Sequence, residues 1–347
     1  MKQPIAIIST DKHLKEQNAE ELLDLAEQEI ELALKLGVDT VFWLGDIFDS
    51  RVSQRQELLT CLDVMLDMYS EAELDLICIP GNHDKTDYTA DDSFLTPYRH
   101  HPGFFLKEEP TLISGRFGDK TIEFAYMPFY AQDVWLEKFK ELPKPKTKNS
   151  ILFSHTAVQG SINNDGQKVN SKIQLKLFKD YGKVFLGHYH DAQQPGSNVF
   201  HLPSTRQNNF GEDENKGFTV LYDDLSFELV KSRFKPYRNI KVDAASVTPE
   251  ELKALAKTDT NEANVRVTLC GDQQAVKAID KKVFQKAGIV VKTKYSEVEA
   301  EEGEVAEVLQ ELSGFDIITK FKTFCEEKGY NYDDGLLILK QVIKCQE

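Results

Sequence analysis

Cysteine is scarce in this sequence, and the spacing of the few cysteines excludes two classes of protein. Among 347 residues there are five, an odd number, widely separated and without a Cys-x-x-Cys pair. A disulfide-linked secreted domain needs an even, closely spaced set, and a zinc ribbon needs Cys-x-x-Cys pairs. We therefore interpret all five as reduced thiols: Cys61, Cys78, Cys270, Cys325 and Cys345.

Long apolar runs are also absent. No stretch approaches the roughly 20 apolar residues that a membrane-spanning helix needs. The N-terminus lacks a basic segment followed by an apolar signal core. With 41% hydrophobic and 29% charged residues the composition is ordinary for a globular protein. These features predict a cytoplasmic protein without a membrane partner.

Positive charge is in deficit. The chain has 42 Lys and Arg residues against 57 Asp and Glu residues, which gives a net charge of -15. Proteins that hold nucleic acid through their global field neutralise phosphates with Lys and Arg. This balance argues against a chain that holds nucleic acid by its own global field.

What the sequence does contain is a set of short apolar runs that end on polar residues. In LDLICIPGNHD, residues 74–84, the apolar part stops at Pro80 and Gly81 and three polar residues follow. Similar runs occupy residues 4–13, 41–49, 150–155 and 183–190, with helical patterns at 19–36, closed by Gly37, and at 55–69. Buried strands alternating with helices predict an α/β sheet, whose ligands gather at the carboxyl ends of the strands.

The residues at these strand ends are of types that bind metal ions. The candidate ligands are Asp11, His13, Asp46, Asn82, His155, His188 and His190. Carboxylate, amide and imidazole ligands without a thiolate favour Mn²⁺, Mg²⁺ or Fe²⁺ over a structural zinc site. Seven ligands exceed the need of one ion and predict two. Two ions held about 3.5–4 Å apart clamp a phosphate ester and activate a bridging water, so the predicted reaction is phosphoester hydrolysis.

Three further residues are candidates for catalysis rather than ligation. His83 is placed to stabilise the transition state or to protonate the leaving oxygen, and Asp84 is expected to orient its imidazole. Asp49 lies one turn beyond Asp46, which predicts a supporting contact behind the ligands. Lys12 places a cation inside the first motif.

Other polar residues have competing interpretations. Any one of these His or Asp residues alone is better explained as a turn or a surface group. His100, His101 and His201 lie outside the motifs, and we interpret them as structural or substrate-rim residues. For Arg51, Arg55 and Arg206, contact with phosphate and a surface ion pair remain equally open.

In their order along the chain, these motifs resemble the calcineurin-like metallophosphoesterase superfamily. The resemblance rests on Asp11-x-His13, Gly45-Asp46-x-x-Asp49, Gly81-Asn82-His83-Asp84, His155 and Gly187-His188-x-His190, over about 200 residues. It implies a four-layer αββα sandwich, a two-metal site and the roles given above.

Within that superfamily the chain resembles the SbcD-type DNA double-strand-break repair nucleases. GDIFDSR and LPSTRQNNFGEDENKGF, residues 202–218, are similar to segments of the T-even phage recombination endonuclease subunit. The resemblance implies a nuclease that cuts DNA ends and hairpins with Mn²⁺, as a homodimer bound to an SbcC-type coiled-coil ATPase, in a bacterial or phage-infected cytoplasm. Cellular members tend to carry His where this chain has Asp49, so the division between endonuclease and exonuclease work is not carried over.

The chain divides into three parts on sequence. We predict a nuclease domain at 1–234, a small α/β capping domain at 235–296 and, at 297–347, an acidic linker followed by a helical partner-binding tail. Within the second part we expect strand, helix, strand between residues 263 and 297, with Gly288 ending the helix. An ATPase partner supplying the basic DNA-binding surface would account for the acidic total.

Two rival functions stay open at this point. The same core could serve a metallophosphoesterase that acts on a small phosphodiester or a phosphoprotein, although a second domain and a helical tail suit a polymeric substrate better. A scaffold without metals is the third hypothesis. The complete ligand set weighs against it, because buried carboxylates and imidazoles cost desolvation energy.

Overall fold

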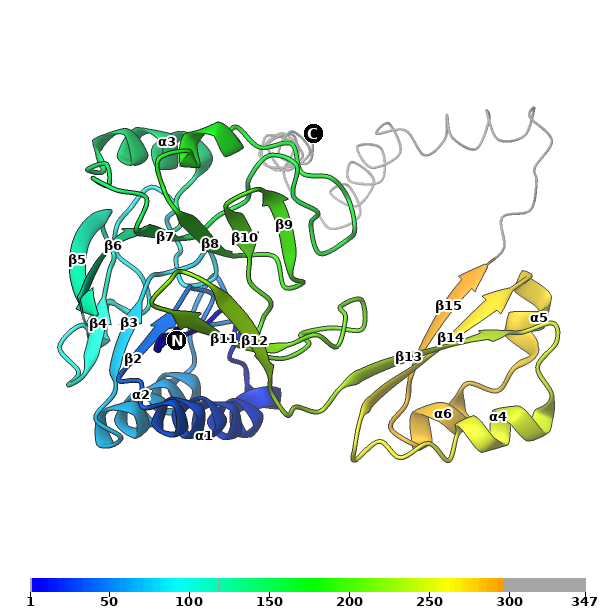
Figure 1. Ribbon diagram of the computed structural model, residues 1–347. Helices are drawn as coiled ribbons and strands as arrows, with labels where there is room; N and C mark the ends of the chain where they lie inside the picture. Colours follow the sequence, from blue (N-terminus) through cyan, green and yellow to red (C-terminus); the bar gives the residue numbers. More distant parts are fainter. Residues whose placement is uncertain (1, 118, 296–347) are drawn as a thin grey trace, which may run out of the picture. The chain divides into compact units, whose positions relative to one another are not determined.

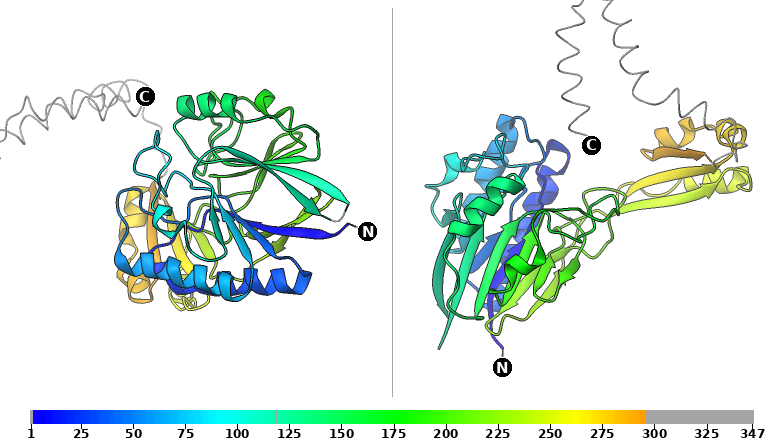
Figure 2. Two further views of the ribbon diagram at one scale, coloured as in Figure 1. Left: turned by 90° about the vertical axis from the view of Figure 1, so that its left-hand side faces the viewer. Right: turned by 90° about the horizontal axis from the view of Figure 1, so that it is seen from above.

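The computed structural model of this chain describes residues 2–117 and 119–295. The predicted tail at 297–347, including Cys325 and Cys345, lies outside the described residues. The chain divides into two compact units, and the larger contains Met1–Ile240. It holds two six-stranded sheets (Figures 1 and 2).

The first sheet has the strand order β12-β11-β1-β2-β3-β4. Its parallel part consists of β1 (Pro4–Ser9), β2 (Thr40–Trp43), β3 (Asp75–Cys78) and β4 (Phe104–Leu106). β11 (Gly217–Tyr222) and β12 (Phe227–Lys231) form a hairpin and add to the sheet antiparallel.

The second sheet has the order β5-β6-β7-β8-β10-β9. Its parallel part consists of β6 (Lys120–Met127), β7 (Ser150–His155), β8 (Lys183–Gly187) and β10 (Val199–His201). β5 (Thr111–Phe117) and β9 (Gln193–Gly196) lie antiparallel at its two edges.

The alternation of side chains along each strand explains how the two sheets stack. On β1 and β2, Ile8 and Phe42 pack in one apolar cluster while their neighbours Ile7 and Trp43 pack in another. Successive side chains of a strand point to opposite faces, so a continuous apolar strand has to be covered on both sides. The prediction of buried strands is confirmed, and these strands are covered on both faces.

Three apolar clusters separate four layers. One joins the first sheet to α1 (Ala19–Leu36) and α2 (Gln56–Glu71), and the second lies between the sheets. The third joins the second sheet to α3 (Gln132–Glu141) and the 3₁₀ turn η3 (Leu175–Phe178). The remaining 3₁₀ turns are η1 (Glu16–Asn18) and η2 (Thr96–Tyr98). The predicted four-layer αββα sandwich is therefore confirmed.

Helix α1 ends where the sequence predicted. Gly37 has φ +65°, and its N–H bonds back to the last turn of the helix. A left-handed residue at this position favours glycine, because a Cβ would be strained there.

A separate three-stranded sheet follows, in the order β13-β14-β15. Its strands are β13 (Tyr237–Asp243), β14 (Asn264–Gly271) and β15 (Val290–Tyr295). Helix α4 (Pro249–Leu255) begins with a capping box in which Thr248 and Glu251 bond to each other's backbone N–H. The helix predicted between β14 and β15 is two short helices, α5 (Gln273–Ala278) and α6 (Lys282–Lys286). The break lies at Ile279, whose backbone is extended. None of the helices in the described part of the chain combines the length and apolar character needed to cross a bilayer.

Candidate metal centre

Five strands end at the place where the candidate ligands meet. Asp11 and His13 follow β1, Asp46 follows β2, and Asn82 follows β3. His155 is the last residue of β7, and His188 and His190 follow β8. The first three strands belong to one sheet and the other two to the second sheet, and all five run parallel within their sheets. The site therefore lies across the carboxyl edges of both sheets.

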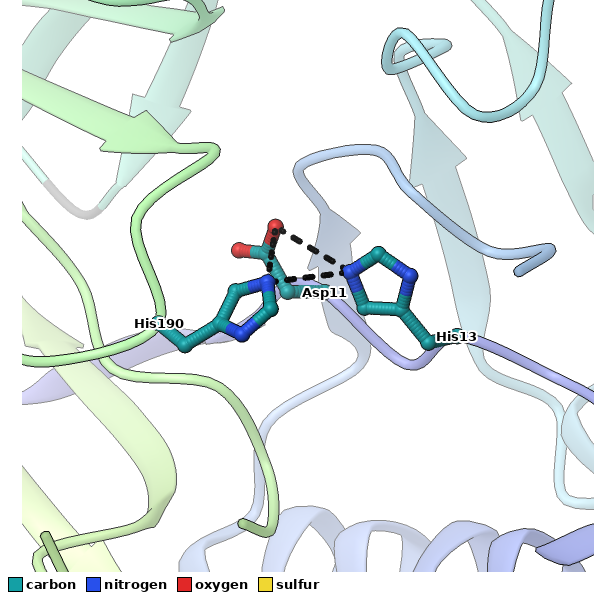
Figure 3. A group of neighbouring side chains, drawn as sticks. All are labelled: Asp11, His13 and His190. Atoms are coloured by element: carbon teal, nitrogen blue, oxygen red, sulfur yellow. Dashed lines mark hydrogen bonds and ion pairs between the residues drawn. The ribbon is translucent and has the colours of Figure 1, made fainter. Parts of the chain in front are cut away.

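The first group of side chains consists of Asp11, His13 and His190 (Figure 3). The Nε2 atoms of the two imidazoles are 3.0 Å apart. Oδ1 of Asp11 lies 4.0 Å from Nε2 of His13 and 3.9 Å from Nε2 of His190. One carboxylate and two imidazoles thus converge on a single point.

The second group contains Asp46, His155 and His188, with Asn82 between them. Oδ2 of Asp46 is 3.2 Å from Nε2 of His155. Oδ1 of Asn82 is 2.8 Å from Nδ1 of His188 and 3.2 Å from Nε2 of His155. Oδ2 of Asp46 also lies 3.7 Å from Nε2 of His13, so Asp46 joins the two groups. The structure brings all seven predicted ligands together.

The backbone at this site is strained. Six described non-glycine residues have positive φ, and four of them are the candidate ligands Asp11, His13, Asp46 and His188. Left-handed backbone costs an L-residue energy and persists where the surrounding structure imposes it, often at functional sites. This concentration is a mark of function independent of residue type.

Close packing of the turns explains two glycines of the motifs. A Cβ on Gly45 would lie 2.6 Å from the backbone N of Gly81, and 2.7 Å from Nδ1 of His155. A Cβ on Gly81 would collide with the Asp46 carboxylate. The turns after β2 and β3 can touch only because both positions lack a side chain.

The electrostatics of the site separate charged from neutral imidazoles. Burial would raise the pKa of Asp46, but His155 outweighs this effect and holds that pKa well below its usual range. Burial would lower the pKa of His155, but the Asp46 carboxylate raises it to about 9. These two groups therefore form an ion pair in the metal-free protein.

Of the other three ligand imidazoles, His13 and His188 are neutral. Burial would lower the pKa of His190, but the hydrogen bond to Glu212 and the Asp11 carboxylate raise it. Burial lowers the pKa of His13 and of His188 well below the usual range, with the neighbouring histidines adding to the effect. Burial raises the pKa of Asp11 despite the nearby imidazoles. Neutral imidazole is the form that binds metal ions, so His13 and His188 need lose no proton to act as ligands.

His83 points toward the same centre and contacts two groups of the turn after β2. Its Nδ1 lies 2.5 Å from the backbone O of Asp49, and its Nε2 lies 2.7 Å from Nη2 of Arg51. A carbonyl accepts and a guanidinium donates, so the proton is on Nδ1 and Nε2 is an acceptor. A ring nitrogen of His83 also lies within 4.8 Å of ligand atoms of His13 and Asp46, so these three residues form a further candidate metal group.

The prediction that Asp84 orients His83 is wrong. The Asp84 carboxylate accepts from the backbone N–H groups of Ile47 at 2.9 Å, Phe48 at 3.0 Å and Gly81 at 2.8 Å. It therefore fixes the turns after β2 and β3 to each other, and the Asp49 carbonyl takes the expected place beside His83. Burial, reinforced by Asp46, raises the pKa of Asp84 to about 7.

Asp49 lies behind a ligand, as expected. Its Oδ1 is 3.5 Å from Nδ1 of His13 and 3.5 Å from Nζ of Lys15. The carboxylate is thus on the side of the His13 ring that faces away from Asp11 and Asp46, where it can hold the ring orientation.

Glu212 is a residue that the sequence did not single out. Its Oε1 lies 2.7 Å from Nδ1 of His190, and its Oε2 lies 3.2 Å from Nζ of the buried Lys216. The only signal was its place in FGEDENKG, where Asp213 and Glu214 are equally acidic. Nothing in the pattern distinguishes the buried carboxylate from the two exposed ones.

Lys12 does not place a cation at the centre. Its side chain runs to Glu29 of α1 and is 2% exposed. Arg206 is neither a surface pair nor a phosphate contact, because it is 1% exposed and its Nη1 faces Glu21 at 3.4 Å. Arg55 pairs with Glu16 on the surface.

The three histidines outside the motifs have separate surroundings. His201 is buried between Ser161 and the backbone O of Gly187. His101 contacts Asp67 at the surface, and His100 is exposed. None of the three belongs to the candidate metal groups found among the described residues.

A cleft of about 350 Å³ opens above the ligands. The lining residues beyond the ligand set and His83 are mostly polar: Lys15, Asp49, Arg51, Asn163, Asn164, Asp165, Tyr189, Asn208 and Asn209. Such a lining suits a charged, hydrated substrate better than an apolar one.

The donor set fits a pair of divalent ions. The three groups of side chains each place their ligand atoms within 4.8 Å of one another, and they share His13 and Asp46. Oxygen and imidazole donors without thiolates match Mn²⁺, Mg²⁺ or Fe²⁺.

Comparison with known proteins gives consistent matches. The sequence profile of calcineurin-like phosphoesterases matches residues 5–192. The DNA double-strand break repair protein Mre11 of Methanosarcina mazei is 26% identical over 340 residues, 92% of this chain and 52% of that protein. Mre11 of Saccharolobus solfataricus is 24% identical over 176 residues, 49% of this chain and 43% of that protein. The chain spans about half the length of these relatives.

A solved nuclease is a weaker match. The crystal structure of Pseudomonas putida nuclease MPE is 14% identical, with a TM-score of 0.27, over 57% of this chain and 67% of that one. This likeness is too slight to support a conclusion.

Proposed function

The chain belongs to the calcineurin-like phosphoesterase family, a family of metal-dependent hydrolases, and we propose that it is a two-metal DNA nuclease subunit acting in DNA repair or recombination. The observation that carries the proposal is the match to an Mre11 double-strand break repair protein along 92% of the chain. The match extends well beyond the 5–192 segment common to the family, so the resemblance includes the later part of the chain.

Asp11, His13, Asp46, Asn82, His155, His188 and His190 would hold the ions. When bound, two such ions neutralise the charge of a phosphodiester and lower the pKa of a water nucleophile. Mn²⁺ is the proposed metal, with Mg²⁺ or Fe²⁺ as alternatives.

His83 and Arg51 would act on the phosphodiester itself. Nε2 of His83 is the ring nitrogen without a proton, and Arg51 donates to it across 2.7 Å. A phosphate group entering the cleft would offer Arg51 a better acceptor, since a guanidinium binds phosphate oxygens in a bidentate manner. His83, once protonated at Nε2, would then donate to the leaving oxygen.

Asp49 and Asp84 support this arrangement in different ways. The backbone carbonyl of Asp49 holds the proton of His83 on Nδ1 and so directs Nε2 into the cleft. Asp84 keeps the turn that carries Asn82 and His83 against the turn that carries Asp46. Both are positioning residues.

The later part of the chain would supply the context for a polymeric substrate. We propose that residues 235–296 form a capping domain and that 297–347 bind an SbcC-type coiled-coil ATPase. The active form would be a homodimer. With a net charge of -15, the isolated chain would bind duplex DNA poorly, and the ATPase would supply most of the basic surface.

The test uses the purified full-length chain with Mn²⁺ on linear duplex DNA, hairpin DNA and a chromogenic phosphodiester, with and without the ATPase. Cleavage of ends or hairpins supports the proposal. Hydrolysis of the small ester without DNA cleavage, even with the ATPase present, would instead indicate a small-substrate phosphodiesterase. Tight binding of duplex DNA by the isolated chain at physiological salt would contradict the explanation of its charge.

A further inference from the structure

Lys12 lies between two candidate ligands but faces the opposite way. Asp11 and His13 point into the metal centre, whereas Lys12 is 2% exposed and reaches into the layer between the first sheet and its helices. There its Nζ lies 3.3 Å from Oε2 of Glu29 and 3.2 Å from Oγ of Ser9, and it stands 4.4 Å from the ring centre of Trp43. The contacts of the Lys12 ammonium therefore lie beneath the metal centre, on the side of the helices.

Glu29 belongs to α1 and is 0% exposed. Its Oε2 accepts from Lys12, from Nε1 of Trp43 at 3.3 Å and from the hydroxyl of Tyr69 at 2.6 Å. Burial, with Glu29 adding to it, raises the pKa of Tyr69 well above its usual range, so the phenol stays a donor. Helices α1 and α2 and strand β2 thus meet at one carboxylate oxygen.

Burial of the Lys12–Glu29 ion pair in the core costs desolvation energy. Oε1 of Glu29 is buried and has no hydrogen-bond partner among the described residues. Replacing a buried ion pair by apolar residues is often neutral or stabilising, because the desolvation of both charges offsets their attraction. Stability alone therefore gives little reason for this pair.

The turn above the pair needs a restraint. Asp11 has φ +53° and His13 has φ +49°, both in the left-handed region. On the side of β2, their N–H groups bond to the backbone O of Gly45 and of Asp46, each at 3.0 Å. The backbone O atoms of Asp11 and His13 accept from Nδ2 of Asn208 at 3.2 Å and from Nδ2 of Asn18 at 2.8 Å. Lys12 is the residue of the turn whose own side chain is anchored in the helical layer.

We propose that the buried Lys12–Glu29 pair is a positioning device that holds the Asp11-Lys12-His13 turn in its strained conformation, and thereby sets the affinity of one of the two metal sites. Because the Lys12 side chain is held beneath the turn, the backbone on either side of it is fixed with the Asp11 and His13 side chains in the metal centre. The affected site is the one formed by Asp11, His13 and His190. This inference rests on the proposed metal centre.

The test measures Mn²⁺ binding by the disappearance of the free-ion electron paramagnetic resonance signal, in the full-length protein. The variants are Lys12→Met, Glu29→Gln and the double variant, in which Gln still accepts from Tyr69 and Trp43. The thermal midpoint of the metal-free protein is recorded for each. We expect wild type to bind two Mn²⁺, and the single variants to bind one ion normally and the other at least tenfold more weakly.

The double variant separates positioning from simple stability. It contains no unpaired charge, so its thermal midpoint should return toward that of wild type. If the pair positions the turn, the weak Mn²⁺ site stays weak even so. If the pair is merely structural, affinity and thermal midpoint recover together, and the inference is overturned.

A matched control is Leu25→Ala, one helical turn before Glu29 on the same buried face of α1. It lowers the thermal midpoint through a cavity without touching the pair. Equal weakening of Mn²⁺ binding in this control and in Glu29→Gln would overturn the inference, as would single variants that bind both ions normally. A wild-type protein that binds no Mn²⁺ would overturn the metal centre itself, a result distinguishable from the others.

Discussion

Oε1 of Glu212 lies 2.7 Å from Nδ1 of His190, on the side of the imidazole opposite to Asp11 and His13. The carboxylate accepts the Nδ1 proton, so Nε2 faces the other candidate ligands. Glu212 is held in turn by the N–H of Asn208 at 2.9 Å and by Nδ2 of Asn209 at 2.7 Å. The orientation of His190 therefore depends on a residue of the loop between β10 and β11, outside the motifs that follow the strands.

Replacing Glu212 by Gln should weaken Mn²⁺ binding about 10- to 100-fold, the usual cost of losing a carboxylate behind a metal-binding imidazole. The amide keeps the shape but loses the charge, so the His190 ring is less firmly oriented. Isothermal titration with Mn²⁺ measures the effect. The exposed Glu214→Gln is the control, and equal affinities in both variants would contradict a role for Glu212.

Replacing His83 by Gln should leave the bound Mn²⁺ intact and reduce cleavage of a phosphodiester by about 10²- to 10⁴-fold, the contribution typical of a general acid or base. Metal content by atomic absorption and turnover on hairpin DNA are measured on the same preparation. His100→Gln, at an exposed position, serves as the control. Loss of metal from the His83 variant would instead make His83 a ligand, since its ring nitrogen lies in a group with His13 and Asp46.

Replacing Asp84 by Asn should destabilise the metal-free protein by about 1–3 kcal/mol, the cost of leaving a buried partner unsatisfied. The amide has one acceptor oxygen, whereas the carboxylate uses one oxygen for Ile47 and Phe48 and the other for Gly81. Urea unfolding gives the free energy of unfolding. The control is Asp92→Asn, because the Asp92 side chain is 85% exposed. An unchanged free energy would show that these bonds contribute nothing.

His201 should make the metal-free protein less stable as the pH falls below neutrality. Burial lowers its pKa to about 3, while the unfolded chain titrates near 6.5. Between these values the unfolded state takes up a proton that the folded state refuses. His201 therefore does not lower the free energy of unfolding above about pH 6.5. Between pH 6.5 and pH 3 it lowers this free energy by up to about 1.4 kcal/mol per pH unit.

The measurement compares urea unfolding of wild type and His201→Gln at pH 7.0 and pH 5.5, with chelator present. Wild type should lose about 1.3 kcal/mol more than the variant over this interval, since one pH unit of it lies below the unfolded pKa. His100→Gln, at an exposed position, should behave as wild type. A slope shared by wild type and His201→Gln would show that another group governs the acid sensitivity.

The sequence correctly predicted those strands and helix ends whose local residue pattern matches their structure in the fold. Apolar runs that end on polar residues predicted β1, β2, β3, β7 and β8, and the parallel order of α/β sheets then implied one common edge. Gly37 marked the end of α1 because its left-handed conformation excludes a side chain. These signals are local in the chain, so a single sequence contains them.

What escaped prediction depends on contacts between distant residues. Whether Asp84 faces His83 or the backbone of Ile47 depends on how two turns pack, and adjacency in sequence pointed to the wrong partner. Lys12 and Glu29 are 17 positions apart on different elements, so nothing local relates them. Glu212 resembles its exposed neighbours until the fold buries it.

The two sheets of the sandwich are joined by an apolar interface along most of their length, and by the ligand residues at one edge. Asp11, Asp46 and Asn82 come from one sheet, and His155, His188 and His190 from the other. A cation bound between them would crosslink the two sheets as well as serve catalysis, because these ligands converge only in the folded chain. The free energy of unfolding would then rise with the logarithm of the free metal concentration. Removal of the ion would therefore abolish activity and weaken the association of the two sheets together.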